Sequence, residues 1–433
     1  QDLFEALLHA EDETSVLAII QDNGLMPLEF WQPLGDLDNA FGIVTNQQQE
    51  ATASLVEKVI NAIDANLTRA CFAAGIDPEG PDAPMSMTDA VGRLFHVPGG
   101  RLGDLTSSEQ RQLAEFIQVV AVGSKPSPSY LIIDKGEGQT PKMQPTTFLS
   151  IAKANKMKIP FVQGKFNSGG TGALPFCGKE NMQLVVSRRN PQCPVASDDE
   201  TADLWGFTLI RRVRPADGRR TSRFYYLAPG GRVPTFAAPH VRILPETVKA
   251  SEPARPYALP LESGTCIKLY NYRWSPRSLA TTDVRYELER YLHQPCLPFR
   301  VIETRPYSGH YFATTVMGIW ATIGSGATEG DEDAKVEEGY PSAESVNIEG
   351  IGKLPYTIAV FKPEVKKRRV PHGIHFAING QSHGQPYGNF IGGKLDFAYL
   401  ADSLLVSVDC TAMSLEAMED FFMGSRDRDR KNE

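Results

Sequence analysis

The chain carries the stretch EKVINAIDA at residues 57–65, and this stretch has the periodicity of a helix. At about 100° per residue, the polar side chains of Glu57, Asn61 and Asp64 fall on one side of that helix. The apolar residues take the other side, which predicts a core-facing surface: Leu55, Val56, Val59, Ile60 and Ile63. The polar side is either solvated, or Glu57 and Asn61 hold a water molecule and a hard cation, which prefers oxygen ligands.

The surrounding sequence predicts a mixed α/β protein. We expect the helix to begin at Asn46 as its N-cap and to end near Cys71, before the breaker DPEGP at 77–81. Residues 2–22 predict one or two short helices. Further helices are expected at 107–121 and 145–157. Apolar runs predict strands at 130–133, 182–187, 204–213, 222–227 and 264–272. Together they indicate a helix layer on an antiparallel-leaning sheet, an α/β sandwich.

A second unit is expected to begin near Ser275. It contains a predicted helix at 282–293, strands at 355–361, 373–379 and 402–409, and a short helix at 414–422. Residues 325–339 are rich in glycine and acidic residues and are expected to form a solvated loop.

Two glycine-rich segments have the composition of ligand-binding loops. In IIDKGEG (132–138), Asp134 ends an apolar strand, and Gly136 and Gly138 permit close approach of a ligand to the backbone. The segment GKFNSGGTG can direct successive N–H groups at an anion, and it comprises Gly164, Lys165, Phe166, Asn167, Ser168, Gly169, Gly170, Thr171 and Gly172. It is not a P-loop, because no Gly-Lys-Ser/Thr ends it. Taken singly, either segment could be an ordinary turn or loop.

In this order, and followed by GTCIKL at 264–269, these segments resemble the GHKL ATPases. That superfamily includes DNA gyrase, the ninety-kilodalton heat-shock chaperones, histidine kinases, MutL and the MORC proteins. Its pattern is a helix with E-x-x-x-N-x-x-D-A, a strand ending in D-x-G-x-G, a glycine-rich ATP lid and a later strand beginning with G-T. The resemblance covers roughly residues 40–272 and implies the Bergerat α/β sandwich, with ATP and Mg²⁺ as ligands.

The resemblance implies a role for each matching residue. Glu57 would polarise the attacking water, and Asn61 would bind Mg²⁺. Asp134 would accept the adenine amino hydrogen, and Thr265 would line the adenine site behind it. Asp64, Gly136 and Gly138 are assigned to the nucleotide site with them, and residues 164–172 to the lid. Two positions depart from the pattern: Ile60, where relatives are often acidic, and Asn167, where a lid glycine is usual.

The second unit resembles a transducer domain, through HFAINGQ at 375–381 and the closing strand and helix at 404–423. This similarity favours a MORC- or MutL-like branch and implies an ATP-gated homodimer rather than a phosphotransferase. It divides the chain into a helical dimerisation strap (1–45), a GHKL domain (46–274) and an α+β transducer-like domain (275–433). Relatives place a cation from the transducer on the γ-phosphate, for which we expect Arg426, then Arg428, and otherwise Lys366 or Lys367.

Composition limits the partners. The net charge of −8 argues against a general nucleic-acid coat. Two basic runs, at 211–220 and 366–369, are either solvated turns or contacts to a DNA backbone. Two function classes therefore stay open. One is an ATP-gated clamp in genome defence or maintenance, with DNA or a nuclease as its partner. The other is a chaperone-like or signalling ATPase that remodels a protein. His372, His375 and His383 are expected to be strand and turn residues rather than metal ligands.

The sequence also indicates the compartment. The six cysteines are scattered without a C-x-x-C pair, which predicts free thiols in a reducing environment. No apolar run reaches the roughly 18 residues of a membrane span, and no signal-like segment opens the chain. We therefore expect a cytoplasmic protein without membrane contact. Because the chain starts at Gln1 and stops in a charged run, we also expect further sequence beyond its ends.

Overall fold

The structure is a computed structural model of the 433-residue chain. It describes residues 1–36, 40–48, 50–151, 158–163, 170–215, 221–244, 260–274, 279–305, 307, 312–323, 335–365, 370–386 and 390–422.

In this part of the chain, ten strands form one large mixed sheet. Nine of them follow the order β1-β6-β5-β4-β8-β3-β2-β9-β10, and β7 pairs with β5. The pairs are antiparallel except for β2 with β9, which is parallel. The strands are β1 (Trp31–Pro33), β2 (Ile117–Gly123), β3 (Pro128–Asp134), β4 (Gln183–Arg188), β5 (Trp205–Val213), β6 (Arg223–Leu227), β7 (Thr235–Phe236), β8 (Gly264–Leu269), β9 (Phe299–Glu303) and β10 (Phe312–Val316).

The described α-helices range from five to 23 residues. They are α1 (Asp2–His9), α2 (Glu13–Asp22), α3 (Ala40–Asn46), α4 (Ala51–Ala73), α5 (Met87–Leu94), α6 (Ser107–Ala114), α7 (Arg285–Glu289), α8 (Ile319–Ile323) and α9 (Leu415–Phe421).

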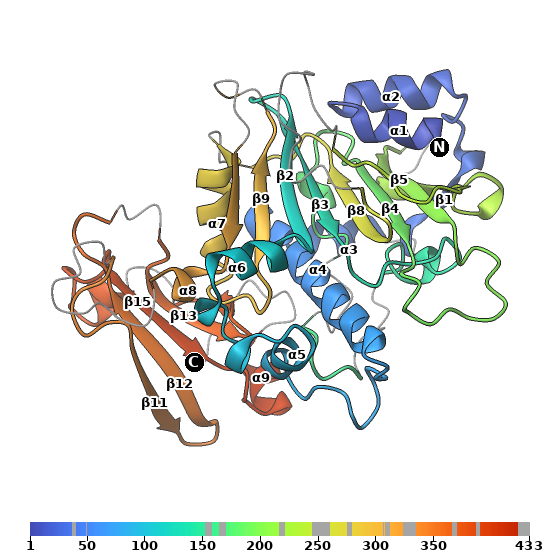
Figure 1. The fold of residues 1–433 in the computed structure, drawn as a ribbon. Coiled ribbons are helices and arrows are strands. Elements are labelled where there is room, and N and C mark those ends of the chain that lie inside the picture. Colours follow the sequence, from blue (N-terminus) through green and yellow to red (C-terminus); the bar gives the residue numbers. More distant parts are fainter. Residues whose placement is uncertain are drawn as a thin grey trace.

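Helices cover both faces of the large sheet. Successive side chains of a strand point to opposite faces. In β3, Tyr130 and Ile132 join the core formed with α4, whereas Leu131 and Ile133 join the core formed with α1 and α2. Figure 1 shows α4 crossing one face of the sheet, and α1 with α2 near β1 and β5. The α/β class is therefore confirmed, but the single helix layer was wrong, because the apolar α1 and α2 bury a second face.

The N-terminal helices are tied to the chain's own sheet. The buried carboxylate of Glu13 accepts hydrogen bonds from the backbone N–H groups of Lys179, Glu180 and Met182 at 2.6–3.0 Å. The ammonium of Lys268 donates to Leu8 O at 2.6 Å and to Ala10 O at 2.5 Å. The segment that we expected to act as a dimerisation strap is thus part of the core of its own chain.

A second, five-stranded sheet lies beyond α7 and α8 (Figure 1). Within the described residues its order is β11-β12-β15-β13-β14. Its strands are β11 (Ser342–Ile348), β12 (Gly352–Val360), β13 (Gly373–Ile378), β14 (Gln381–Gly384) and β15 (Leu404–Asp409). The change of sheet does not fall at residue 275, because β9 and β10 complete the first sheet. Most of the loop expected at 325–339 lies outside the described residues.

Most predicted strands are confirmed, but three predicted helices change. The helix predicted at 107–121 ends at Ala114, because the β-branched run that follows forms β2. Asn46 ends α3 rather than capping α4, which begins at Ala51. Of the helix predicted at 145–157, residues 152–157 lie outside the described residues. Residues 144–146 form a 3₁₀ turn, where Pro145 lacks a donor and the Thr147 hydroxyl donates to the Met143 carbonyl at 2.9 Å.

Candidate functional site

A cavity of about 310 Å³ lies between α4 and the strands β3, β8 and β4. Its volume falls in the range of small-molecule sites, which starts at about 300 Å³. Residues that are far apart in the sequence, from Glu57 to Ile267, meet in its wall. Six of the predicted site residues are among them: Glu57, Asn61, Asp134, Gly138, Gly170 and Thr265.

Asp134 and Thr265 form one end of the cavity. They are register partners across β3 and β8. The Asp134 side chain is 7% exposed, and its Oδ1 accepts the Gly136 N–H at 2.9 Å. The Thr265 hydroxyl lies 3.0 Å from the Ser187 hydroxyl. This end therefore offers a fixed carboxylate to a ligand that donates a hydrogen bond.

The turn after Asp134 is held tightly between α4 and β4. A Cβ on Gly136 would lie 2.5 Å from Ala65 Cβ, and one on Gly138 would lie 1.9 Å from the Arg188 carbonyl oxygen. Gly138 also has a φ of +57°, which favours glycine. Both glycines are needed for packing within the chain. Gly138 lines the cavity, whereas Gly136 is not part of its wall.

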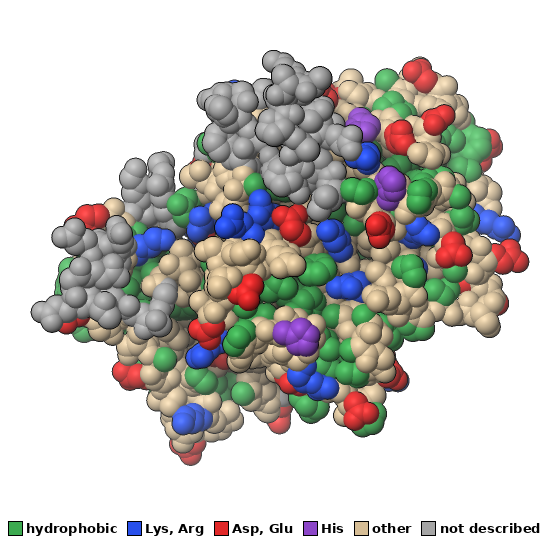
Figure 2. All heavy atoms as spheres, viewed as in Figure 1, with side chains coloured by type: hydrophobic (Ala, Val, Ile, Leu, Met, Phe, Trp, Pro, Cys, Tyr) green, Lys and Arg blue, Asp and Glu red, His purple; other side chains and the backbone are tan. Residues whose placement is uncertain are grey.

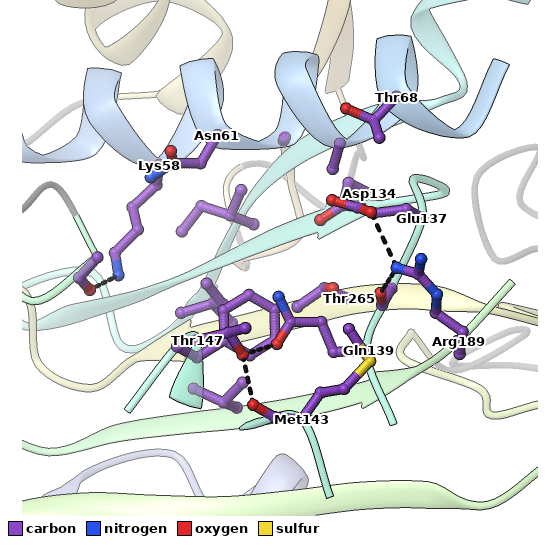
Figure 3. A pocket seen from close by; sticks show the side chains of 18 of the residues that line it. Lys58, Asn61, Thr68, Asp134, Glu137, Gln139, Met143, Thr147, Arg189 and Thr265 are labelled. Carbon is purple, nitrogen blue, oxygen red and sulfur yellow. Dashed lines mark hydrogen bonds and ion pairs between the residues drawn. The ribbon is translucent and has the colours of Figure 1, made fainter. Parts of the chain in front are cut away.

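An ion pair closes the cavity beside this turn. Arg189 Nη1 lies 2.8 Å from Glu137 Oε2 and also donates to the Gly138 carbonyl at 3.0 Å. Both side chains line the cavity (Figure 3). Glu137 occupies the variable position between the two glycines of the D-x-G-x-G motif, and Arg189 has no motif around it, so neither residue was predicted.

The other end of the cavity, called the α4 end below, is formed by Glu57, Lys58 and Asn61 of α4. Glu57 is 4% exposed, and its Oε1 accepts a hydrogen bond from Gln381 Nε2 at 3.2 Å. Lys58 donates to the Gly170 carbonyl and, at 3.2 Å, to Gln183 Oε1. Figure 3 shows Lys58 and Asn61 extending from α4 at one end, with Asp134, Glu137 and Arg189 toward the other. Burial lowers the pKa of Lys58 to about 8.

Asp64 does not line the cavity. Its Oδ1 instead accepts the backbone N–H of Gln163 at 3.0 Å. The side-chain amide of Gln163 donates to Gln381 Oε1 at 2.7 Å and to the Ile378 carbonyl at 3.1 Å. Asp64 therefore fixes a residue that joins α4 to the β13–β14 hairpin.

Only the end of the predicted lid is described. Gly170 lines the cavity, the buried Thr171 hydroxyl donates to Gln47 Oε1 at 2.7 Å, and the Gly172 carbonyl accepts from Ser54 Oγ at 3.0 Å. The remaining predicted lid residues, 164–169, lie outside the described residues. So do Arg426 and Arg428, predicted to reach the γ-phosphate, and the alternatives Lys366 and Lys367.

The described arginines of the first basic run have intramolecular partners. Arg211 is buried, with its guanidinium 4.1 Å from the Trp31 ring centroid, and it donates to the Met26 carbonyl at 3.1 Å. Arg214 pairs with Glu180 at 2.9 Å. In Figure 2, basic side chains follow a broken band across one face, with acidic side chains between them. These contacts weaken the interpretation of Arg211 as a contact to DNA.

His375 and His383, in the second sheet, contact polar groups through their rings. His375 Nδ1 lies 2.9 Å from Ser382 Oγ, and its Nε2 lies 3.0 Å from the His372 carbonyl. His383 Nε2 lies 3.2 Å from Gln163 Nε2. Among the described residues, no group of three or more histidine, cysteine, aspartate or glutamate side chains could hold a metal ion.

No protein-family model matches the chain, and no curated protein matches it. In the described part of the chain, no helix is both long enough and apolar enough to cross a membrane.

Proposed function

We propose that this cavity binds ATP with Mg²⁺ and hydrolyses it, and that the chain is a GHKL-type ATPase. One observation carries the proposal. Glu57, Asn61, Asp134 and Thr265, which the motif spacing singles out over more than 200 residues of sequence, line the same cavity. The polar groups are also divided between its two ends, as a ligand with a base at one end and phosphates at the other requires.

The Asp134 end fits adenine. The adenine amino group donates a hydrogen bond, and the Asp134 carboxylate accepts one. Guanine carries a carbonyl oxygen at that position, which would face the carboxylate with no hydrogen between them. A buried acceptor left without a donor is costly, so the site favours ATP over GTP.

The α4 end fits the phosphates. The Glu57 carboxylate can orient a water molecule and take its proton, as a general base must. The Asn61 amide oxygen suits Mg²⁺, which binds few protein ligands and completes its shell with water and phosphate oxygens. When bound, Mg²⁺ would neutralise charge on the phosphates, where positioning and charge compensation account for most of the catalysis.

Replacing Glu57 tests the hydrolysis step. Glu57→Gln keeps the shape of the side chain but removes the base. We expect ATP to bind as before, while turnover falls by about 100-fold or more, the usual contribution of a general base. Phosphate release and calorimetric titration of the same protein measure the two properties.

The matched control is Glu79→Gln, a second carboxylate in the cavity wall outside the motif. It should leave turnover within about two-fold of the unmodified protein, because the Glu79 carboxylate lies outside the motif and pairs with Lys158 at 3.9 Å. Turnover by Glu57→Gln at the unmodified rate would remove Glu57 from the mechanism.

A further part of the proposal, an ATP-gated homodimer, rests on the resemblance of the second unit to a transducer domain. The hydrogen bond between Gln381 and Glu57 joins the second sheet to the α4 end, so we expect nucleotide binding to change how the second sheet is held. The client is DNA in one form of the proposal and a protein in the other. If the client is DNA, we expect DNA to change the ATPase rate, and we expect this effect to fall steeply as the salt concentration rises. If the client is a protein, we expect DNA to leave the ATPase rate unchanged.

A further inference from the structure

Lys58 is a buried cation at the α4 end of the cavity. Its side chain is 3% exposed and lines the cavity wall. Its ammonium group donates to two neutral oxygens, the Gly170 carbonyl and Gln183 Oε1. Among the described residues, no carboxylate lies within 4.0 Å of Lys58 Nζ.

A buried ammonium without a carboxylate partner is unfavourable. Removing the ammonium from water costs free energy, and hydrogen bonds to neutral oxygens offset only part of this cost. Burial lowers the pKa of Lys58 to about 8, so the ammonium group is still protonated in most molecules at pH 7. The charge therefore lies beside a cavity that holds room for an anion.

Lys268, on β8, is a second buried lysine, and its contacts are structural. Burial lowers its pKa to about 8 as well. Its ammonium donates to the Leu8 and Ala10 carbonyls, which join α1 to the sheet. Unlike Lys58, it is not part of the cavity wall.

We propose that Lys58 is a phosphate-binding residue, which pairs its ammonium with the polyphosphate of the bound nucleotide. This inference rests on the proposed function. It places the cation on the same helix as Glu57 and Asn61, at the opposite end of the cavity from Asp134. Charge-assisted hydrogen bonds to phosphate oxygens are stronger than those to neutral carbonyls. The Gly170 carbonyl would then be the partner of Lys58 in the free protein.

The test compares ATP with adenosine, which lacks phosphates. Calorimetric titrations with Mg²⁺ present would use the full chain, Lys58→Met and the control Lys268→Met. We expect Lys58→Met to bind ATP about 30-fold more weakly, as expected for the loss of a charge-assisted contact. Its affinity for adenosine should stay within about two-fold of the unmodified protein. Lys268→Met should keep the unmodified ratio of ATP to adenosine affinity.

The outcomes separate this inference from the proposed function. If the unmodified protein binds neither ATP nor adenosine, the proposed function fails and this inference fails with it. If it binds both, and Lys58→Met leaves ATP affinity unchanged or weakens ATP and adenosine equally, only the phosphate role of Lys58 is overturned. Methionine is apolar and similar in length to lysine, so the variant should fold, and its thermal unfolding midpoint verifies this.

Discussion

At the scale of residues, burial excludes a fully solvated polar side of α4. Glu57 and Asp64 are buried, and Asn61 is partly buried. Glu57 faces the cavity, and Asp64 fixes the backbone of Gln163. Spacing within one helix is local, so the sequence could predict which side chains share a face. It could not predict that Asp64 would turn to a partner 99 residues away.

Two residues of the site, Lys58 and Gln381, were not predicted because their contacts are long-range. Lys58 lies within the motif, between the polar and apolar sides of the helix, and this position was the only indication in the sequence that its side chain could reach the cavity. Its importance depends on Gly170 and Gln183, which approach it only in the folded chain. Gln381 was recognised as part of a strand resemblance, but nothing in its sequence neighbourhood indicates a contact with Glu57.

The lowered pKa of Lys58 predicts a pH dependence of stability. Its pKa falls from 10.5 to about 8 on burial. Between these values the unfolded chain binds the proton that the folded chain has lost, so this group makes stability rise with pH. Below pH 8 the buried charge opposes folding, and we expect Lys58→Met to be more stable than the unmodified protein there.

The measurement is the difference in unfolding free energy between Lys58→Met and the unmodified protein, from urea titrations at pH 7 to 10. The difference should shrink as the pH rises through about 8. Titratable and polar groups facing Lys58 are the Cys177 thiol, whose pKa is raised by burial, and the neutral Gln183 amide. Glu57 is its neighbour on α4. A difference that stays constant over this range would contradict the assignment of a lowered pKa.

At the scale of elements, the central strands position the site. β3 and β8 are neighbours in the interior of the sheet, so Asp134 and Thr265 are held from both sides. The apolar runs of these strands predicted them correctly. The parallel pairing of β2 with β9 could not be predicted, because it joins segments about 180 residues apart. Because this long-range pairing is not visible in the sequence, we expected a unit boundary at residue 275, before two strands, β9 and β10, that belong to the first sheet.

The N-terminal helices are part of the core of their own chain. Their apolar spacing correctly predicted helices, and the dimerisation role that the resemblance implies stays a prediction. Phe4 and Leu7 are buried against the chain's own sheet, and Glu13 binds three backbone N–H groups there. Deleting residues 1–35 would therefore expose a core, and the loss of a dimer after that deletion would not identify a strap.

At the scale of the whole molecule, the two sheets meet at the β13–β14 hairpin. The Gly380 carbonyl accepts the His293 N–H at 2.8 Å, and Gln381 reaches Gln163 and Glu57. Gly380 has a φ of +75°, and a Cβ there would lie 2.0 Å from the Gln294 carbonyl oxygen. The hairpin is therefore packed tightly against residues 293 and 294, and this packing holds the Gln381 amide beside the Glu57 carboxylate, which we propose as the base.

This contact predicts a kinetic effect of the second sheet. Gln381→Leu removes the hydrogen bond that orients Glu57 but leaves the ATP contacts of α4 and β3 in place. We expect turnover to fall about 10-fold, in line with the loss of a positioning contact, while ATP affinity changes less than about two-fold. Steady-state hydrolysis and calorimetric titration measure the two quantities.

The matched control is Ser382→Ala, in the same hairpin, whose hydroxyl contacts His375 instead of the cavity. It should leave turnover unchanged. Equal losses of turnover in both variants would attribute the effect to the hairpin as a whole and count against a positioning role for Gln381.

The central claim is that this cavity is an adenine-nucleotide site, and calorimetric titration of Mg·ATP tests it most directly. Three proteins are needed: the unmodified chain, Asp134→Ala, and the control Asp77→Ala, a carboxylate of the same cavity wall outside the motif. We predict that the unmodified chain and Asp77→Ala bind ATP alike. Asp134→Ala should bind at least about 100-fold more weakly, because the adenine amino group would lose the carboxylate that accepts its hydrogen bond. Full ATP affinity in Asp134→Ala, or no binding by the unmodified chain, would contradict the account.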